Sequence, residues 1–379
     1  MVSCGEASGD LYAGALVEAL RAIDPAVGVF GFGGPRLRAS GADLVGSYDG
    51  VSVTGLVEAA GVMRRAWEML RRLREAAATR RPDVFVAIDF PDFNLRLLPA
   101  VHGLGIPIVY YVSPQLWAWR PGRIETLKKY VTEMAVIFPF EREIYERAGI
   151  PVTFVGHPLV DLAVPSMPRT AWLERIGLSP DRPIVALLPG SRPNEVRRIL
   201  PVLVSAAPEI ARQVSGAQFV VARAPRLDDD LFARTGEVRR ASVPLTIVEG
   251  AADDVIAAAD VVVTASGTAT VQTALHGRPM VIVYGLSPLT YAIGRKFVRV
   301  PSYGMPNLIA GRPVVPELIQ QDFTVENVVR ETVSLLTDAA RAERARDDLV
   351  EVRRALGEPG ASTRVARAVL DAAHEKPRR

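Results

Sequence analysis

The sequence predicts an α/β protein with two domains, each built on a doubly wound parallel sheet. Short apolar runs alternate with segments of helical periodicity along most of the chain, as in proteins whose parallel strands are joined by helices. A proline-containing stretch at 162–170 interrupts this alternation, which then starts again. The chain, at 379 residues, is also longer than a domain with a single hydrophobic core usually is. We therefore expect domains at 1–164 and 165–345, followed by a helical tail at 346–379.

The composition is that of a globular protein and excludes several classes. Hydrophobic residues make up 49% of the chain and charged residues 23%. The sequence has neither an apolar run of membrane-spanning length nor a signal-peptide pattern, so we expect a cytoplasmic protein. The single cysteine, Cys4, cannot form a disulfide within the chain, and the four histidines lack metal-binding spacing. We expect no metal or other cofactor, and the net charge of +3 is too small to predict nucleic-acid binding.

The first domain opens with a very short apolar run and then the small-residue stretch Gly5–Asp10. Its glycines permit a tight turn, and either Ser8 or Asp10 could cap the helix that follows. Open α/β sheets bind ligands at the carboxyl ends of their strands, so this loop could also contact a ligand. The simpler alternative is a capped helix without a ligand. We next expect a strand and a loop-rich segment, at 27–32 and 41–54.

The segment at 62–77 has the periodicity of an amphipathic helix. Apolar side chains recur on one face, and arginines lie on the opposite face. A crossover helix that packs on the sheet fits this pattern, and so does an interfacial helix that touches anionic lipid.

A strand is expected at 84–88, because its hydrophobicity is continuous as in buried parallel strands. Asp89 follows directly at the strand end, where a carboxylate is costly unless it is paired, caps a helix or is catalytic. We therefore take Asp89 as the candidate general base. Asn94 lies slightly further on and has the character of a turn or cap residue.

The next buried strand, at 106–112, leads into a loop that contains Ser113 and Trp117. Aromatic residues on such a loop can line a sugar or acyl pocket, or can simply cover the end of the sheet. The rest of this domain continues the alternation, with strands at 134–138 and 152–155 and a helix at 141–148 between them.

The second domain begins with a strand at 184–188, followed by Gly190, Ser191 and Arg192 and a helix from about residue 194. This order directs backbone N–H groups and the positive end of a helix dipole at one point, where a phosphate would bind. Arg192 could pair with phosphate oxygens in bidentate fashion. The alternative is an ordinary turn with a solvated arginine. Later strands are expected at 219–222, 245–248, 261–264 and 280–284.

A second small-residue turn, Ser266, Gly267 and Thr268, precedes another helix. Two such turns suit a diphosphate, whereas the glycine-rich loop of P-loop enzymes and a metal-holding Asp-x-Asp pair are missing from the sequence. We therefore expect Arg192 and helix dipoles to neutralise a leaving group without a bound metal ion. Asn307 could bind a ligand or its own turn, and 316–320 is expected to start a helical segment.

Taken in order, these motifs resemble the lipid-A-disaccharide synthase family, which consists of inverting glycosyltransferases of the GT-B type. The resemblance implies two Rossmann-like domains that face a cleft. It also implies transfer of 2,3-diacylglucosamine from its UDP form to 2,3-diacylglucosamine 1-phosphate, giving the β-1,6-linked lipid A disaccharide 1-phosphate and UDP. The strings that carry it are Gly5–Asp10, Ile88–Asn94, Tyr111–Trp119, Phe138–Phe140, Gly156–His157, Pro189–Arg192 with Glu195, Ala265–Thr270, and Pro306–Arg312 with Pro316–Gln320.

The resemblance also implies roles for individual residues. Asp89, Arg192 and Asn307 correspond to catalytic residues: a base, an arginine beside the diphosphate and an asparagine in the cleft. The donor site would comprise Gly190, Ser191, Arg192, Glu195, Ser266, Gly267, Thr268 and Gln272. The acceptor side of the cleft would comprise Glu6, Ser8, Asn94, Ser113 and Trp117.

The sequence departs from the family pattern in two places. Gln272 stands where the family usually has a glutamate, and its amide oxygen can accept a hydrogen bond without carrying charge. The chain also begins only four residues before Gly5, so we expect either a start further upstream or a shortened first strand with fewer ladder hydrogen bonds.

The implied mechanism is a direct displacement in which Asp89 helps to deprotonate the acceptor 6-hydroxyl. Because both substrates are acylated, we expect the helix at 62–77 to contact the anionic inner-membrane surface, with the protein peripherally attached on the cytoplasmic side. The alternatives are a UDP-N-acetylglucosamine 2-epimerase, another GT-B enzyme acting on soluble UDP-sugars, or a non-catalytic nucleotide-sugar-binding module. The sequence leaves open whether the chain forms a homo-oligomer.

Overall fold

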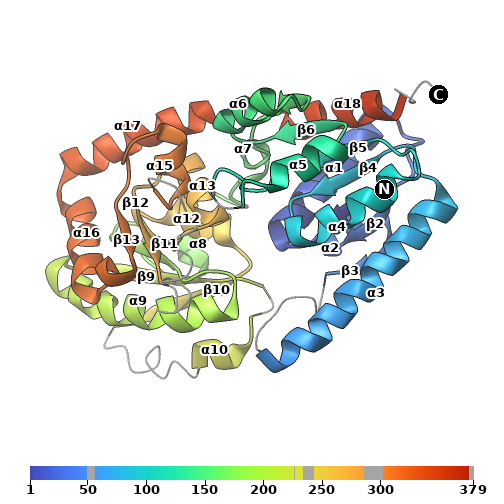
Figure 1. Cartoon of the computed structure of the whole chain (residues 1–379). Coiled ribbons are helices and arrows are strands. Elements are labelled where there is room, and N and C mark those ends of the chain that lie inside the picture. The colour runs from blue at the N-terminus through green and yellow to red at the C-terminus, as the bar shows by residue number, and fades with distance from the viewer. Residues whose placement is uncertain (49–55, 119, 226, 234–242, 286–301, 375–379) are drawn as a thin grey trace. The chain divides into compact units, whose positions relative to one another are not determined.

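A computed structural model of the chain describes residues 1–48, 56–118, 120–225, 227–233, 243–285 and 302–374, with the side chains of 56–62 left out. These residues form two compact units (Figure 1). One unit contains Met1–Pro158 together with the C-terminal segment Leu356–Arg379. The other contains the described residues between 159 and 355.

The first unit is built on a seven-stranded sheet in the order β3-β2-β1-β4-β5-β6-β7. Every neighbouring pair is parallel, so all of its strands have their carboxyl ends at the same edge. The strands are β1 (Val2–Cys4), β2 (Phe30–Gly33), β3 (Asp43–Ser47), β4 (Phe85–Ile88), β5 (Ile108–Tyr111), β6 (Glu133–Val136) and β7 (Val152–Phe154).

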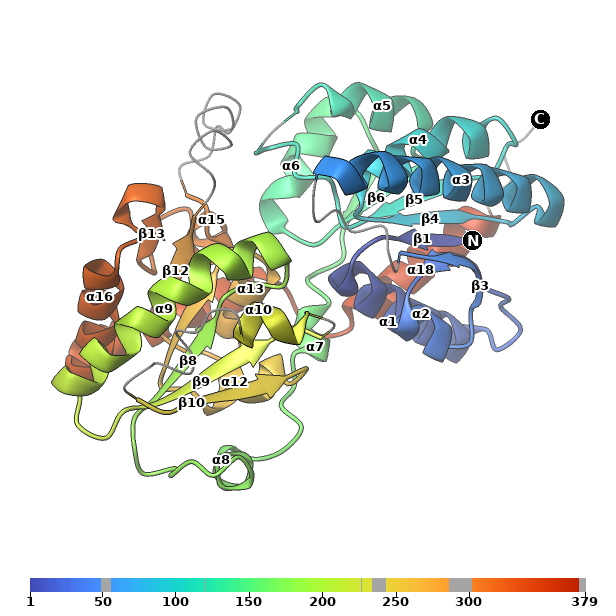
Figure 2. The same ribbon diagram turned by 90° about the horizontal axis from the view of Figure 1, so that it is seen from below.

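Helices cover both faces of this sheet. Figure 2 shows α3, α4 and α5 on one face and α1, α2 and α18 on the other. Leu73, Leu97 and Leu127, from the helices of the first group, are buried in one core with Phe85 and Tyr110 of the sheet. The helices are α1 (Ala7–Ile23), α2 (Pro35–Ala39), α3 (Leu56–Arg80), α4 (Pro91–His102), α5 (Arg123–Tyr130), α6 (Pro139–Ala148) and α18 (Ala361–His374).

The second unit repeats the plan with six strands in the order β10-β9-β8-β11-β12-β13, again all parallel. The strands are β8 (Ile184–Leu188), β9 (Gln218–Arg223), β10 (Leu245–Glu249), β11 (Val261–Ala265), β12 (Met280–Tyr284) and β13 (Glu317–Ile319). Its helices are α7 (Leu159–Leu162), α8 (Arg169–Arg175), α9 (Pro193–Gln213), α10 (Asp229–Ala233), α12 (Ala252–Ala258), α13 (Thr268–Leu275), α15 (Met305–Ala310), α16 (Val325–Thr337) and α17 (Ala339–Ala355), with a 3-10 turn at Gln320–Asp322.

Most predicted strands and helices are present, but two segments differ. The segment expected to be loop-rich, 41–54, contains β3, which lies at the edge of the sheet that the described residues form and pairs with β2. Because an edge strand is largely half-exposed, its sequence needs no continuous apolar run to mark it as a strand. The segment 316–320 was expected to begin a helix. It instead forms the edge strand β13, because its backbone pairs in register with β12 through Val283 and Leu318.

The C-terminal part of the chain is divided between the two units. α17 packs against α13, α15 and α16 of the second unit. α18 packs against α1 and the sheet of the first unit, where Val365, Ala366 and Val369 are buried. Residues 346–379, expected to be one tail, therefore contribute to two cores.

Among the described residues, none of the helices is both long and apolar enough to cross a lipid bilayer.

Candidate active site

Each sheet has one point at which its strand order reverses. In the first unit, the chain fills β1, β2 and β3 in one direction and then continues from β4 in the other, so the reversal lies between β1 and β4. In the second unit, the corresponding reversal lies between β8 and β11. Ligands of open α/β sheets bind outside the carboxyl ends of the strands at this point. The loops after β1, β4, β8 and β11 are therefore where a site is expected.

Asp89, the predicted base, is half-buried directly after β4. Its φ is 44° and that of Phe90 is 49°, so two consecutive residues with side chains adopt the left-handed conformation. Such a conformation costs about 1–3 kcal/mol per residue and persists only where neighbours hold it. The Asp89 N–H donates to Tyr111 O over 3.0 Å, and its carbonyl accepts from the Tyr110 hydroxyl over 2.8 Å. The backbone that aims the Asp89 carboxylate is therefore fixed by β5.

Asn94 holds the same turn from the side of α4. Its side chain is 0% exposed, and its Nδ2 lies 2.8 Å from the Asp89 carbonyl oxygen. Its Oδ1 accepts from the Ser3 hydroxyl over 2.7 Å, which connects the turn to β1. Asn94 therefore joins the two strands at the reversal point and presents no surface to a ligand in this conformation.

The loop after β1 lies against the ring of Phe90. A Cβ atom on Gly5 would lie 2.2 Å from Cγ of Phe90, so only glycine fits there. Glu6 is exposed at the N-cap of α1, and Ser8 is half-buried in its first turn. The predicted cleft residues of this loop therefore lie at the same sheet edge as Asp89.

Asp10, a predicted candidate for the cap of α1, instead caps α2. Its carboxylate is buried and accepts from the N–H groups of Gly34 over 2.7 Å, Arg36 over 2.9 Å and Leu37 over 3.1 Å. These donors belong to the first turn of α2, whose N–H groups have no partner within the helix. The role of the Asp10 carboxylate is therefore structural, since it holds the start of α2.

Ser113 and Trp117 follow β5 and contact a carboxylate that we did not single out from the sequence. Glu141 Oε1 accepts from the Ser113 hydroxyl over 2.9 Å and from Trp117 Nε1 over 3.4 Å. Its Oε2 accepts from the Phe138 N–H over 3.2 Å. The Ser113 Oγ also lies 2.8 Å from the Tyr145 hydroxyl. Trp119, in the same predicted motif, lies outside the described residues.

Glu141 is 1% exposed, and this burial raises its pKa to about 7, against the opposing effect of its hydrogen bonds. In the sequence, Glu141 is only the first residue of the helix expected at 141–148. The partners that bury it, Ser113 and Tyr145, come from another loop and from the next turn of α6. A glutamate three residues into a proline-started helix was the available signal.

His157, the histidine of the matched motifs, is buried behind this loop. Its ring centroid lies 6.0 Å from that of Tyr12 and 5.3 Å from that of Phe138. Burial lowers the pKa of His157 to about 3, so the imidazole is neutral near pH 7. It serves as part of an aromatic core in this structure.

In the second unit, the turn after β8 has the predicted strand–turn–helix geometry. Gly190 has a φ of 108°, and a Cβ there would lie 2.6 Å from Glu195 Oε2. That same oxygen accepts from the N–H groups of Ser191 and Arg192 at 3.3 Å each, and Oε1 accepts from Arg192 Nη1 over 3.2 Å. The Glu195 carboxylate thus lies where N–H groups, a helix start and a guanidinium converge on negative charge.

The turn after β11 is more open. Gly267 is exposed at the N-cap of α13 with a φ of 153°, and a Cβ added there would meet no atom within 4 Å. Thr268 is exposed beside it, and the Ser266 hydroxyl donates to the Tyr303 carbonyl over 2.9 Å. The N–H groups at the start of α13 therefore have room for an anion next to them.

Gln272 lies one turn further along α13 and pairs with a residue that we did not select from the sequence. Its Nε2 donates to Asp253 Oδ1 over 3.1 Å, and His276 Nε2 lies 3.0 Å from the same oxygen. Asp253 lies in the first turn of α12 and is half-buried. A negative charge is therefore present beside Gln272, although residue 272 itself is neutral.

Asn307 is 2% exposed, and its amide is fully used inside the protein. Nδ2 donates to Val315 O over 2.9 Å and to Glu317 Oε1 over 2.7 Å. Oδ1 accepts from the N–H groups of Val314 over 2.7 Å and Val315 over 2.9 Å. These four bonds exhaust the capacity of an asparagine side chain, so Asn307 has none left for a ligand in this conformation.

Glu317 connects Asn307 to the donor turn. Its carboxylate accepts from the N–H groups of Tyr303 over 2.8 Å and Gly304 over 3.0 Å. The carbonyl of Tyr303 is the acceptor for Ser266. Asn307 therefore supports the turn at Ser266 through a chain of two intervening residues.

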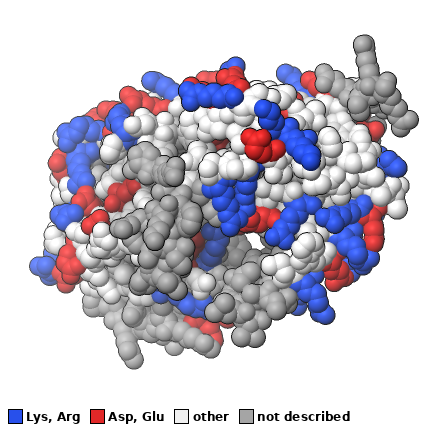
Figure 3. Space-filling view, viewed as in Figure 1, with Lys and Arg blue, Asp and Glu red and all other residues white. Residues whose placement is uncertain are grey.

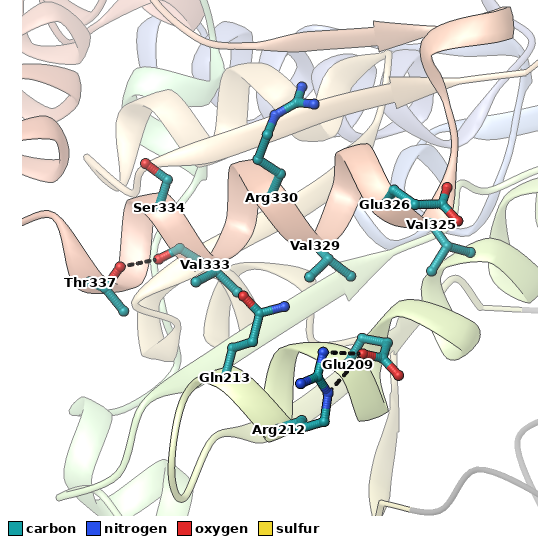
Figure 4. A pocket seen from close by; sticks show the side chains of 10 residues that line it. All are labelled: Glu209, Arg212, Gln213, Val325, Glu326, Val329, Arg330, Val333, Ser334 and Thr337. Carbon is teal, nitrogen blue, oxygen red and sulfur yellow. Dashed lines mark hydrogen bonds and ion pairs between the residues drawn. The ribbon is translucent and has the colours of Figure 1, made fainter.

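A surface groove of 760 Å³ lies elsewhere on the second unit, between α9 and α16 (Figure 4). Val325, Val329 and Val333 form its apolar side, and Arg212, which pairs with Glu209, lies across from them. None of the predicted site residues is among the described residues that line it. The candidate site therefore lies at the reversal points of the sheets and not in this groove.

Comparison with known proteins identifies the family of the chain. Residues 1–371 match the family model described as lipid-A-disaccharide synthetase. The lipid-A-disaccharide synthase of Myxococcus xanthus (strain DK1622) is 44% identical over 371 residues, which cover 98% of this chain and 96% of the relative.

Solved structures share the fold at low sequence identity. The UDP-GlcNAc 2-epimerase of Neisseria meningitidis, bound to UDP-GlcNAc, has a TM-score of 0.67 at 10% identity, with 98% of each chain covered. A calicheamicin glycosyltransferase has a TM-score of 0.59 at 17% identity, with 99% of this chain and 97% of that chain covered. These likenesses identify a GT-B architecture of two Rossmann-like domains. Together with the sequence match over nearly its whole length, they lead to one conclusion: the chain belongs to the lipid-A-disaccharide synthetase family.

Proposed function

We propose that this enzyme transfers 2,3-diacylglucosamine from UDP-2,3-diacylglucosamine to 2,3-diacylglucosamine 1-phosphate. The products would be the β-1,6-linked lipid A disaccharide 1-phosphate and UDP. Family membership supports this reaction. The observation that carries it is Asp89, a half-buried carboxylate held in a strained turn at the reversal point of the first sheet. Strained backbone of this kind clusters at active sites and ligand-binding turns.

In this proposal the Asp89 carboxylate accepts the proton of the acceptor 6-hydroxyl as that oxygen attacks the anomeric carbon. The attack comes from the face opposite UDP, so the configuration inverts. Glu6, Ser8, Ser113 and Trp117 provide the acceptor side, because their loops leave the same edge of the first sheet. Asn94 acts through Asp89, whose carbonyl it holds.

The leaving diphosphate would bind to the second unit at the turns after β8 and β11. Gly190, Ser191 and Arg192 offer N–H groups and a guanidinium, and Gly267 and Thr268 offer the open start of α13. These groups stabilise the charge that develops on UDP without requiring a bound metal ion. Glu195 now holds the N–H groups of Ser191 and Arg192, and we propose that it turns away from at least one when the donor binds.

We further propose that the enzyme attaches peripherally to the anionic cytoplasmic face of the inner membrane through α3. Met63 is 52% exposed and Trp67 is 51% exposed, with the Arg96 guanidinium 5.4 Å from the Trp67 ring centroid. Arg64 and Arg65 are also exposed. Figure 3 displays basic side chains interspersed with acidic ones over this helix. Exposed apolar and basic residues on one helix suit a lipid interface, where the acylated substrates reside.

UDP release tests the reaction directly. The full chain is given UDP-2,3-diacylglucosamine with and without 2,3-diacylglucosamine 1-phosphate, in the presence of EDTA. We expect release that depends on the acceptor and a fall in kcat of about 100- to 10,000-fold in Asp89→Asn. Asp92→Asn is the matched control, because Asp92 is exposed on the same segment and pairs with Arg120 and Arg123. Absence of acceptor-dependent release would contradict the reaction, and full activity in Asp89→Asn would contradict the base.

A further inference from the structure

The buried carboxylate of Glu141 gathers donors from two separate segments. One segment is the loop after β5, which contributes the Ser113 hydroxyl and the Trp117 indole N–H. The other is the start of α6, which contributes the Phe138 N–H. Ser113 and Trp117 precede Glu141 by 28 and 24 residues, so these bonds connect parts of the chain that local structure does not hold together. Glu141 thus determines where the Trp117 indole lies relative to α6.

The indole of Trp117 packs edge-on against Phe140, with ring centroids 5.3 Å apart and planes at 89°. Phe140 stacks on Phe138 at 5.6 Å, and Phe138 is followed by His157 at 5.3 Å. The inner rings, Phe138 and His157, are buried, whereas Trp117 and Phe140 are only half-buried. The row of rings therefore ends in an aromatic pair that is open to solvent.

The surface that Trp117 and Phe140 expose to a ligand is apolar. The one polar atom of Trp117, its indole nitrogen, already donates to Glu141, and Phe140 has none in its side chain. An apolar surface of this kind binds alkyl chains, and it lies on the loops that follow β5 and β6 of the first sheet. On the proposed function, the apolar groups that come to this unit are the acyl chains of the acceptor.

We infer that Glu141 is a positioning residue, which holds Trp117 against Phe140 so that the pair contacts an acyl chain of the acceptor substrate. Two of its donors, the Phe138 N–H and the Trp117 N–H, cannot accept a hydrogen bond. Glutamine at 141 can keep only one oxygen acceptor and presents an NH₂ group where the other oxygen was. It therefore releases one of the two segments while preserving the size of the side chain.

The test compares acceptor kinetics of the full chain and its variants. The variants are Glu141→Gln, Trp117→Ala and the control Glu143→Gln, which alters an exposed residue of the same helix that pairs with Arg147. UDP release is measured at about pH 8.5, where a carboxyl group with a pKa of about 7 is ionised, with varied 2,3-diacylglucosamine 1-phosphate at saturating donor and then with varied donor. We expect both Glu141→Gln and Trp117→Ala to raise the acceptor KM about tenfold or more, with the donor KM and the Glu143→Gln control unchanged.

Acceptors with shortened acyl chains separate a chain contact from a general structural effect. We expect the difference between wild type and both variants to shrink as the chains shorten, because the lost contact is then absent in wild type too. An unchanged acceptor KM overturns the inference, as does an equal rise for donor and acceptor or a loss that is independent of chain length. If Glu141→Gln does not fold, Trp117→Ala alone must give the expected pattern. Absence of UDP release by the wild type overturns the proposed function and this inference together.

Discussion

The side-chain amide of Gln272 donates a hydrogen bond to Asp253 Oδ1 over 3.1 Å, and His276 Nε2 lies 3.0 Å from the same oxygen. Gln272 and Asp253 come from neighbouring helices, α13 and α12, and both are half-buried. The pair supplies one negative charge at a place where a glutamate at residue 272 would also supply one. The negative charge near the donor turn is thus provided by Asp253 of α12, and not by residue 272 of α13.

From this pair we predict that Asp253→Asn raises the donor KM about tenfold, since it removes a charged hydrogen-bond acceptor from the donor side. Gln272→Glu should also impair the donor step, because two carboxylates would then lie within hydrogen-bond distance and repel each other. The double variant Asp253→Asn with Gln272→Glu reverses the direction of the bond and should recover most of the loss. Steady-state UDP release measures all three, with Asp347→Asn on the exposed face of α17 as the control. Additive losses in the double variant would contradict the pairing.

A second prediction concerns the saturated amide of Asn307. Asn307→Asp replaces two donated hydrogen bonds and sets a second carboxylate beside Glu317. We expect the free energy of unfolding near pH 7 to fall by at least about 2 kcal/mol, and the donor KM to rise because Tyr303 and Ser266 lose their support. Urea denaturation at pH 7 and pH 5 should give a smaller loss at pH 5, where one carboxyl group can hold a proton. Asn327→Asp, in the first turn of α16, should change stability little.

The buried carboxyl group of Glu141 predicts a pH-dependent stability difference. Its folded pKa of about 7 lies above the ordinary value of 4.5, so the folded state holds this proton more tightly than the unfolded state. The stability that this proton confers is fully present below pH 4.5 and is lost as the pH rises through about 7. Relative to Glu141→Gln, the wild type should therefore lose free energy of unfolding across that window, on the order of 3 kcal/mol. Denaturant titrations of both proteins between pH 4 and pH 8 measure the difference, and a constant difference would contradict it.

The proposed membrane surface predicts a specific binding defect. The double variant Met63→Ser with Trp67→Ser should bind vesicles of anionic phospholipid about tenfold more weakly, because two exposed apolar side chains are removed. Wild-type binding should also fall as salt is added, since arginines near the surface contribute. Vesicle sedimentation measures both effects. Val164→Ser changes an exposed apolar residue of the second unit and should leave binding unchanged.

The central strands of both sheets were predictable, because strands buried on both faces have continuous hydrophobicity. The run at 184–188 coincides with β8, whose residues are all buried. Two of the four edge strands, β3 and β13, were not predicted, whereas the edge strands β7 and β10 were. Strands β3 and β13 are short and half-exposed, and their pairing partners on β2 and β12 supply the order that their own residues do not specify.

The candidate site was predictable where a residue follows a strand end, as Asp89 and Arg192 do, because the position alone identifies the sheet edge. Glu141 and Asp253 could not be selected in the same way. Their hydrogen-bond partners Trp117 and Gln272 are distant in sequence. The local signal, an acidic residue in a first helical turn (after a proline for Glu141), indicates a cap and not a site residue. The sequence around Asn307 was compatible with a ligand contact and with a turn residue. Its four internal hydrogen bonds are visible only in the tertiary structure.

The packing of α18 on α1 has a consequence for biosynthesis. Because the first unit takes its last helix from the end of the chain, it cannot complete its fold while the ribosome is still translating the second unit. The apolar residues that α18 covers in the native state remain exposed during that whole interval. Nascent chains of this enzyme should therefore engage holding chaperones until α18 has emerged from the ribosome, and a circular permutant that joins Ala361–His374 ahead of α1 should be released from them earlier.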